Sequence, residues 1–134
     1  MLVLHAGKPL AVCHSNSAKG TGEVSSANYE ARAFGIKADM FIADAKRRCP
    51  DLIVMPYEFD RYEAVSEAVY RILLSTTACV QPISCDEAWL DVTGLGNPLK
   101  IAADVREAIW QATGCTASAG IGPNMLVARL ATRK

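Results

Sequence analysis

The sequence predicts an α+β fold, because short apolar runs of strand type alternate with segments of helical periodicity. In residues 52–121 these segments follow the order strand, helix, strand, strand, helix, strand, which is the order of a ferredoxin-like fold. Of the 134 residues, 51% are hydrophobic and 21% are charged. A chain of this length and apolarity folds as one small globular domain, or as a small domain with a satellite.

The first predicted elements occupy the N-terminal third of the chain. Residues 9–14 form an apolar run of strand type, and residues 15–26, rich in Ser, Gly, Thr and Asn, predict a loop. Residues 29–34 fit a helix, with Asn28 as its N-cap and Gly35 as the residue that ends it.

A second short helix is predicted by apolar residues spaced three and four apart in residues 42–49, and Pro50 stops it. Residues 52–55 are apolar and predict a strand. The chain is therefore expected to divide into a small mixed unit, residues 1–56, and a second unit, residues 57–134.

The second unit is expected to contain two long helices. Residues 62–73 place apolar side chains at helical spacing, and a further helix starts at Asn97 and runs to Gly114. Residues 115–119 alternate like a strand. After a turn, residues 124–134 predict a last helix.

Composition excludes few functions. Because 14 Lys and Arg balance 14 Asp and Glu, any nucleic-acid contact requires a local basic patch. No apolar stretch approaches the roughly 20 residues that span a bilayer, so we expect an intracellular chain without a membrane partner. Five cysteines without a CxxC pair indicate neither a disulfide framework nor a zinc site.

Two adjacent carboxylates, Asp86 and Glu87, lie between the apolar runs 82–85 and 88–92. A tight connection between two strands projects its residues from the end of a sheet, where two carboxylates can share one divalent cation. Oxygen ligands suit Mg²⁺, which takes one or two protein carboxylates together with substrate phosphates. The alternative is a pair of ordinary acidic turn residues. The neighbouring Cys85 is interpreted as a buried thiol rather than a nucleophile.

A second candidate site is formed by Tyr29 and Arg32, which lie three residues apart on one face of the predicted helix. They belong to its first turn, where free N–H groups and the helix dipole favour anions, and Arg adds bidentate phosphate geometry. A triphosphate would suit this position. The alternative is that Tyr29 packs on the core while Arg32 pairs with Glu30 or another acid.

The sequence resembles the Y-family translesion DNA polymerases along nearly its whole length. The matching segments occur in the same order as in that family: residues 28–36, Met40, residues 44–46, 49–52, 84–92, 118–124 and 128–131. The resemblance implies a polymerase-type palm, ferredoxin-like with its first strand missing, and a small α/β fingers subdomain. It also assigns residues 52–55 to the fingers, paired with residues 9–14, so the ferredoxin-like order counted above includes a strand of another subdomain.

The resemblance assigns roles to the two candidate sites. Asp86 and Glu87 are expected to hold Mg²⁺, two ions in the complete enzyme, and to activate the primer 3′-hydroxyl, while Tyr29 and Arg32 grip the β- and γ-phosphates of a deoxynucleoside triphosphate. Primer–template DNA is the expected partner. Basic residues near the end of the chain are candidates for DNA phosphate contacts, although a solvated helix face explains them equally well: Arg129, Arg133 and Lys134.

Within the family, the sequence looks most like the Rev-type deoxycytidyl transferase, which inserts dCMP opposite abasic sites and damaged guanine. The segments that carry this likeness are residues 8–12, 15–16, 20–22, 84–87 and 131–134. Ala38 stands where the relative that bypasses thymine dimers has a basic residue. We therefore expect dCTP as substrate, a nuclear location, and other translesion polymerases as partners through regions outside this chain. The alternatives are another Y-family bypass polymerase and a non-catalytic ferredoxin-like binding module.

The family also has catalytic elements that this sequence does not show. A further Asp on the first palm strand, the Arg that replaces the template base, and a later Lys that helps bind the triphosphate have no counterpart here. The thumb and little-finger domains are missing as well. We therefore expect a fragment that is catalytically incomplete alone and is marginally stable or prone to aggregation.

Overall fold

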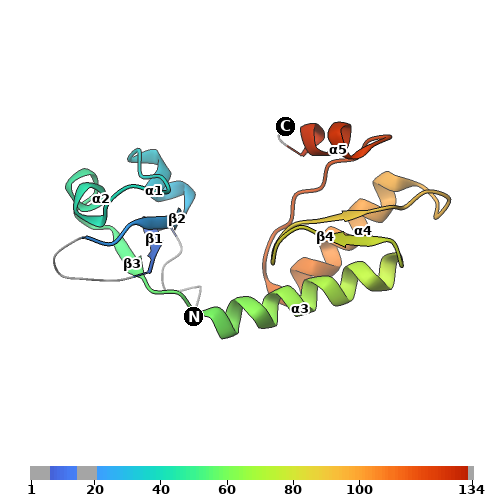
Figure 1. Ribbon diagram of the computed structural model, residues 1–134, viewed down its shortest axis with the longest axis horizontal. Coiled ribbons are helices and arrows are strands. Elements are labelled where there is room, and N and C mark those ends of the chain that lie inside the picture. Colours follow the sequence, from blue (N-terminus) through green and yellow to red (C-terminus); the bar gives the residue numbers. More distant parts are fainter. Residues whose placement is uncertain (1–6, 15–20, 133–134) are drawn as a thin grey trace. The chain divides into compact units, whose positions relative to one another are not determined.

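A computed structural model describes residues 7–14 and 21–132 of the chain. The chain divides into two compact units, Met1–Glu58 and Phe59–Lys134. Across the described ranges, no helix combines the length and the apolar character needed to cross a membrane. In chain order the elements are β1 (Leu10–Cys13), β2 (Val24–Ala27), α1 (Tyr29–Ala33), α2 (Ile42–Arg48), β3 (Ile53–Met55), α3 (Phe59–Thr76), β4 (Val80–Pro82), β5 (Ala88–Leu90), α4 (Pro98–Thr113) and α5 (Met125–Ala131) (Figure 1).

The first unit is built on a three-stranded sheet of order β2-β1-β3. The central strand β1 runs antiparallel to β2 and parallel to β3, with Leu10 opposite Ile53 and Val12 opposite Met55. The predicted pairing of residues 52–55 with residues 9–14 is therefore confirmed. The ferredoxin-like order predicted for residues 52–121 is wrong, because its first strand, residues 52–55, pairs with β1 in this sheet.

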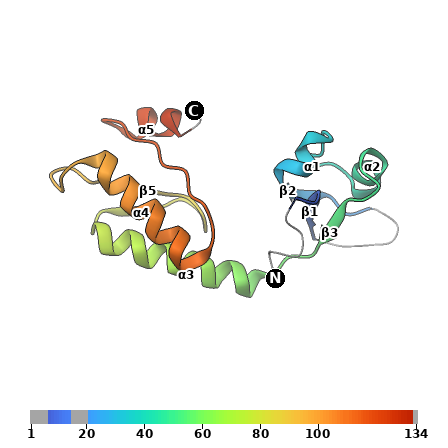
Figure 2. The ribbon, with the colours of Figure 1, turned by 180° about the vertical axis from the view of Figure 1, so that it is seen from behind.

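Helices α1 and α2 lie on the same side of this sheet (Figures 1 and 2) and close its core. The helices end where the sequence predicts: α1 stops before Gly35, which adopts φ 73°, and α2 stops before Cys49 and Pro50. Small and branched apolar side chains fill the core: Ala11, Cys13, Val24, Ala27, Ala31, Ile36, Ile42, Ala45, Cys49 and Leu52.

The predicted loop over residues 15–26 is wrong at its end, because β2 begins at Val24. Residues 15–20 lie outside the described part of the chain. In β2, Val24 and Ala27 are buried whereas Ser25 and Ser26 are exposed, so the strand lacks the apolar alternation that sequence reading relies on. Its pairing with the central strand β1, interrupted by a register shift between Val12 and Cys13, stabilises it as a strand.

The second unit places the long helices α3 and α4 against each other, with the antiparallel hairpin β4–β5 in the same unit (Figure 2). The hairpin pairs Val80 with Leu90 and Pro82 with Ala88. The predicted first long helix is confirmed and starts slightly earlier, at Phe59.

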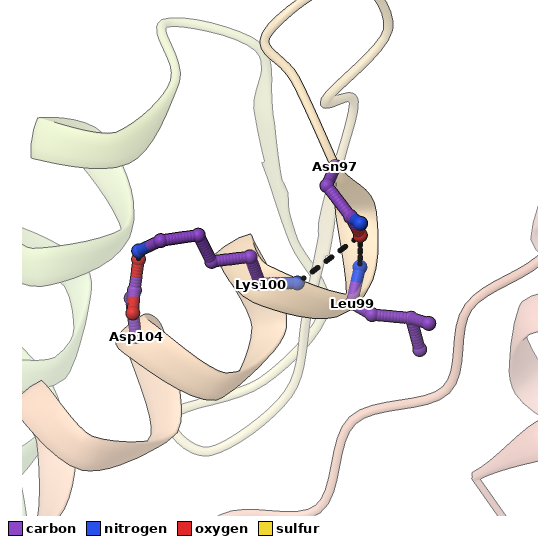
Figure 3. A network of polar contacts seen from close by, with 4 residues as sticks. All are labelled: Asn97, Leu99, Lys100 and Asp104. Atoms are coloured by element: carbon purple, nitrogen blue, oxygen red, sulfur yellow. Dashed lines mark hydrogen bonds and ion pairs between the residues drawn. The ribbon is translucent and has the colours of Figure 1, made fainter.

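Helix α4 begins and ends as predicted because its caps are local. The Asn97 side-chain oxygen accepts hydrogen bonds from the N–H groups of Leu99 at 2.9 Å and Lys100 at 3.3 Å (Figure 3). Two groups that helix starts otherwise leave unpaired are thereby satisfied. At the other end Gly114 adopts the left-handed conformation, and its N–H donates to the Trp110 carbonyl at 2.8 Å.

The predicted strand over residues 115–119 is wrong. Its sequence alternates, but among the described residues no strand pairs with it, and a strand without a partner leaves its backbone groups to other contacts. One such contact comes from Arg106, whose Nε donates to the Ala117 carbonyl at 2.7 Å. The final helix is confirmed as α5, whose N–H at Val127 is capped by the Asn124 side chain at 3.0 Å.

Candidate metal and triphosphate site

The turn between β4 and β5 is organised by Ser84. Its hydroxyl oxygen accepts hydrogen bonds from the N–H groups of Asp86 at 3.3 Å and Glu87 at 3.1 Å, and the hydroxyl donates to Asp86 Oδ1 at 2.6 Å. The Glu87 carbonyl closes the turn, because it accepts from the N–H groups of Ile83 at 2.9 Å and Ser84 at 3.2 Å. The two carboxylates are thus held next to each other on a short closed turn.

Both carboxylates of this turn face solvent. Asp86 and Glu87 are exposed, and the Glu87 carboxylate makes no hydrogen bond or ion pair with any residue that the structure describes. Asp86 uses one oxygen for the Ser84 hydroxyl. Carboxylate oxygens therefore remain available to a cation at both residues.

The donor set fits magnesium. Within residues 7–14 and 21–132, no group of three or more His, Cys, Asp or Glu side chains is placed to enclose a metal ion. Two carboxylates suffice for Mg²⁺ when waters and substrate phosphates complete its octahedral shell. Zinc, by contrast, prefers nitrogen and sulfur ligands in a closed tetrahedral site.

Cys85 is exposed on this turn, so its interpretation as a buried thiol is wrong. Cys85 lies in the turn between β4 and β5 and not in a strand that faces a core. Its thiol makes a weak contact with Asp86 Oδ1 at 3.9 Å. Cys13 and Cys49, by contrast, are buried in the core of the first unit.

A third acidic residue near the hairpin, Asp91, is hydrogen-bonded through both its backbone and its carboxylate. Asp91 follows β5, its N–H donates to the Cys79 carbonyl at 3.0 Å, and its own carbonyl accepts from the Thr77 hydroxyl at 2.9 Å. Its carboxylate accepts from the Thr93 N–H at 2.9 Å. Hydrogen bonds from the Thr93 side chain and backbone lower the pKa of Asp91 below its usual range.

The second candidate site starts from Asn28, where β2 becomes α1. The Asn28 carbonyl accepts from the Arg32 N–H at 2.9 Å and so starts the helix. The side-chain oxygen of Asn28 connects the helix to the sheet, because it accepts hydrogen bonds from the Leu10 N–H at 2.9 Å and from the Ala31 N–H at 3.0 Å. The side-chain amide donates to the Lys8 carbonyl at 2.8 Å. One side chain thus fixes the first turn of α1 to β1.

That first turn displays Tyr29 and Arg32 together. The Tyr29 side chain is 84% exposed, and the Arg32 guanidinium carbon lies 5.3 Å from the centre of its ring, a distance at which cation and ring attract each other. Arg32 Nε donates to the Ala27 carbonyl at 2.8 Å, which orients the guanidinium. The alternative of a core tyrosine and an Arg32–Glu30 pair is not what the described residues form.

The structure thus brings the predicted residues together in two pairs, one in each unit. Tyr29 and Arg32 share the first unit, whereas Asp86 and Glu87 share the second. Arg129 is exposed on α5. The other two predicted DNA contacts, Arg133 and Lys134, lie outside the described residues.

Residues 3–133 match the family described as impB/mucB/samB, so nearly the whole chain is covered. The chain belongs to the impB/mucB/samB family. Among similar proteins, the Arabidopsis thaliana "DNA repair protein REV1" is 54% identical over 98% of the chain. The Schizosaccharomyces pombe "DNA repair protein rev1" and the Agrobacterium fabrum "DNA polymerase IV 2" are each 45% identical, over 95% and 94% of the chain.

Solved structures agree with this membership of the impB/mucB/samB family. A "Y-family DNA polymerase chimera" superposes with a TM-score of 0.91 and the "Insertion ternary complex of Dbh DNA polymerase" with 0.89, each at 34% identity over 98% of the chain. The resemblance to Y-family polymerases and the α+β prediction are confirmed. The chain spans 12% of the Arabidopsis relative, 36% of the Agrobacterium relative and 40% of the Dbh chain.

Proposed function

We propose that this chain supplies the metal-binding hairpin and the triphosphate-binding helix of a Y-family DNA polymerase that acts in translesion synthesis. The activity is DNA-directed nucleotidyl transfer in DNA repair. The observation that carries the proposal is the pair of exposed carboxylates at Asp86 and Glu87, held on a hairpin turn by Ser84. Membership of the impB/mucB/samB family supports it.

Each residue pair has a distinct task in this mechanism. Asp86 and Glu87, both exposed, would hold Mg²⁺, with two ions in the complete enzyme. Magnesium, when bound, neutralises phosphate charge and makes the primer 3′-hydroxyl more acidic. Tyr29 donates its hydroxyl to a phosphate oxygen. Arg32, oriented by its bond to the Ala27 carbonyl, offers its two terminal nitrogens to the β- and γ-phosphates.

The finer assignment is dCMP insertion opposite abasic sites or damaged guanine, with dCTP as substrate. The 54% identity to the Arabidopsis "DNA repair protein REV1" supports it, as does the Ser84–Cys85 sequence before the carboxylates. With this assignment go a nuclear location, contacts to other translesion polymerases through regions outside this chain, and contacts of Arg129, Arg133 and Lys134 with DNA phosphates.

The triphosphate site is tested by isothermal titration calorimetry. In this experiment dCTP and Mg²⁺ are added to a longer polypeptide, in which this chain is extended at both ends. Because a hydrogen bond to a charged group contributes about 1.5–3 kcal/mol, Arg32→Ala is expected to weaken binding by roughly 10- to 100-fold. Arg47→Ala is the matched control, since Arg47 is exposed on α2 and pairs with Asp44. Equal affinities of the Arg32 and Arg47 variants would refute the assignment.

The choice of nucleotide distinguishes the two polymerase candidates. In a chimera that carries residues 3–133 in the matching segment of the Arabidopsis relative, dCTP should be preferred opposite every template base. Template-following insertion would instead favour a conventional bypass polymerase, for which the 45% identity to "DNA polymerase IV 2" is the supporting observation. Because the rest of the chimera can itself set this preference, the same reaction is run with the Agrobacterium relative as host.

A further inference from the structure

Tyr70, on α3, reaches the turn that carries the two carboxylates. Its hydroxyl lies 2.6 Å from the Ser84 carbonyl oxygen and 3.0 Å from the Glu87 carbonyl oxygen. A phenol has one proton to donate, so the two carbonyls share it. Neither the helical spacing of α3 nor the sequence of the turn indicates this contact, because Tyr70 is 14 and 17 residues away from its acceptors.

The two carbonyls belong to the first and last residues of segment 84–87, which carries both carboxylates. Ser84 and Glu87 enclose Cys85 and Asp86, so a group that ties both carbonyls to α3 fixes where the carboxylates are presented. Among the described residues, the remaining hydrogen bonds of the turn run between its own residues. The N–H groups of Asp86 and Glu87 donate to the Ser84 hydroxyl, which donates to Asp86 Oδ1, and the N–H groups of Ile83 and Ser84 donate to the Glu87 carbonyl. They fix the shape of the turn but not its position relative to α3.

The turn is exposed, which makes this attachment consequential. All residues from Ile83 to Glu87 are exposed, so apolar packing contributes little to holding them. Two carboxylates that share one small cation must keep a nearly fixed separation and orientation, because Mg²⁺ demands near-ideal octahedral geometry. Hydrogen bonds behind the ligands are the usual way in which proteins fix such geometry.

We propose that Tyr70 is a positioning residue for the metal site: its hydroxyl pins the carbonyls of Ser84 and Glu87 to α3 and thereby presents Asp86 and Glu87 to a divalent cation. This inference rests on the proposed function. Tyr70 touches neither substrate nor metal in this role. It acts through the backbone of the turn, and the hydroxyl alone, not the ring, carries the effect.

The test is Tyr70→Phe, which removes the hydroxyl and keeps the ring. The 15N-labelled chain is titrated with Mn²⁺, and paramagnetic broadening of the amide signals of Asp86 and Glu87 gives the affinity. Since one hydrogen bond contributes about 0.5–1.5 kcal/mol, we expect two- to tenfold weaker binding. Tyr62→Phe is the matched control, because Tyr62 lies on the same helix and packs edge-on against Phe59.

Unchanged Mn²⁺ affinity in Tyr70→Phe overturns the inference while leaving the proposed function intact. Loss of the native signals of α4 together with those of the turn overturns it too, because Tyr70 would then hold the whole unit rather than the turn. Absence of broadening at Asp86 and Glu87 in the unaltered chain is a different result: it overturns the proposed function itself.

A kinetic measurement separates positioning from general damage. In the chimera described above, Tyr70→Phe should raise the Mg²⁺ concentration for half-maximal primer extension by a similar two- to tenfold factor and leave the KM for dCTP nearly unchanged. Saturating Mn²⁺ should restore most of the rate. A rise in the KM for dCTP without a change in metal dependence would contradict a role at the metal site.

Discussion

Asn28→Ala should cost more stability than the loss of an ordinary helix cap, because Asn28 also completes the pairing of β1. Loss of the cap to the Ala31 N–H costs about 1 kcal/mol. The half-buried N–H of Leu10 loses its acceptor as well, which adds about 1–3 kcal/mol. The Lys8 carbonyl is exposed and can turn to water. The expected total is about 2–4 kcal/mol.

Two matched variants isolate these contributions. Asn28→Asp keeps a side-chain oxygen for both N–H groups but sets a carboxylate oxygen, which cannot donate, opposite the exposed Lys8 carbonyl. Because that carbonyl can turn to water, the substitution should cost less than Asn28→Ala. Asn97→Ala removes a cap whose two bonds are both exposed and should cost about 1 kcal/mol.

The assay is urea denaturation followed through the NMR signals of the unit that contains the substitution. Hydrogen exchange of the Leu10 and Ala31 amides provides a local readout, and both should exchange faster in Asn28→Ala than in Asn28→Asp. The reasoning is refuted if Asn28→Ala costs no more than Asn97→Ala. A cost for Asn28→Asp equal to that of Asn28→Ala would contradict the role of the side-chain oxygen as acceptor.

Three further predictions concern the stability or the local structure of the fold. Ile36→Ala removes a side chain that is 1% exposed and should cost about 2–5 kcal/mol in urea denaturation, whereas Ile83→Ala, at an exposed position, should stay within about 0.5 kcal/mol. Gly120→Ala should displace α5, because the added methyl group overlaps a backbone carbonyl of that helix; unchanged amide shifts in α5 would refute this. The pKa of Asp91 is lowered by Thr93, so ionised Asp91 stabilises the fold above its unfolded pKa of about 3.9, and this contribution is lost as the pH falls through the folded pKa. The melting temperature, followed by tryptophan fluorescence, should be higher for the unaltered chain than for Asp91→Asn near neutral pH. This difference should shrink as the pH falls from about 5 to about 3.

Helix ends could be predicted from the sequence because the groups that fix them are local. Asn28, Asn97 and Asn124 each bond to N–H groups within the next three residues, and Gly114 ends α4 through its own backbone conformation. A reader of the sequence sees every partner of these interactions within one turn of helix.

Strands depended on partners that the local sequence does not show. Residues 24–27 contain two exposed serines and form β2 because β1 lies beside them. Residues 115–119 have the alternation of a strand, yet no described strand pairs with them. Alternation describes which faces a segment can offer, whereas a strand also requires hydrogen-bonding neighbours.

The candidate sites divide in the same way. Residue type and spacing identified Asp86, Glu87, Tyr29 and Arg32 as candidates, and the resemblance assigned their roles. The support behind Asp86 and Glu87 was not predictable, because Tyr70 reaches their turn from α3 through a tertiary contact.

We propose that Asp86 and Glu87 are the metal-binding carboxylates of a nucleotidyltransferase. This role is tested most directly by Mg²⁺-dependent primer extension by the chimera, with and without Asp86→Asn and Glu87→Gln, which keep side-chain size and remove charge. We predict extension by the unaltered chimera and loss of at least a thousandfold of the rate, about 4 kcal/mol of barrier, in the double variant. Extension by the double variant at a rate within tenfold of the unaltered chimera would contradict this role of Asp86 and Glu87.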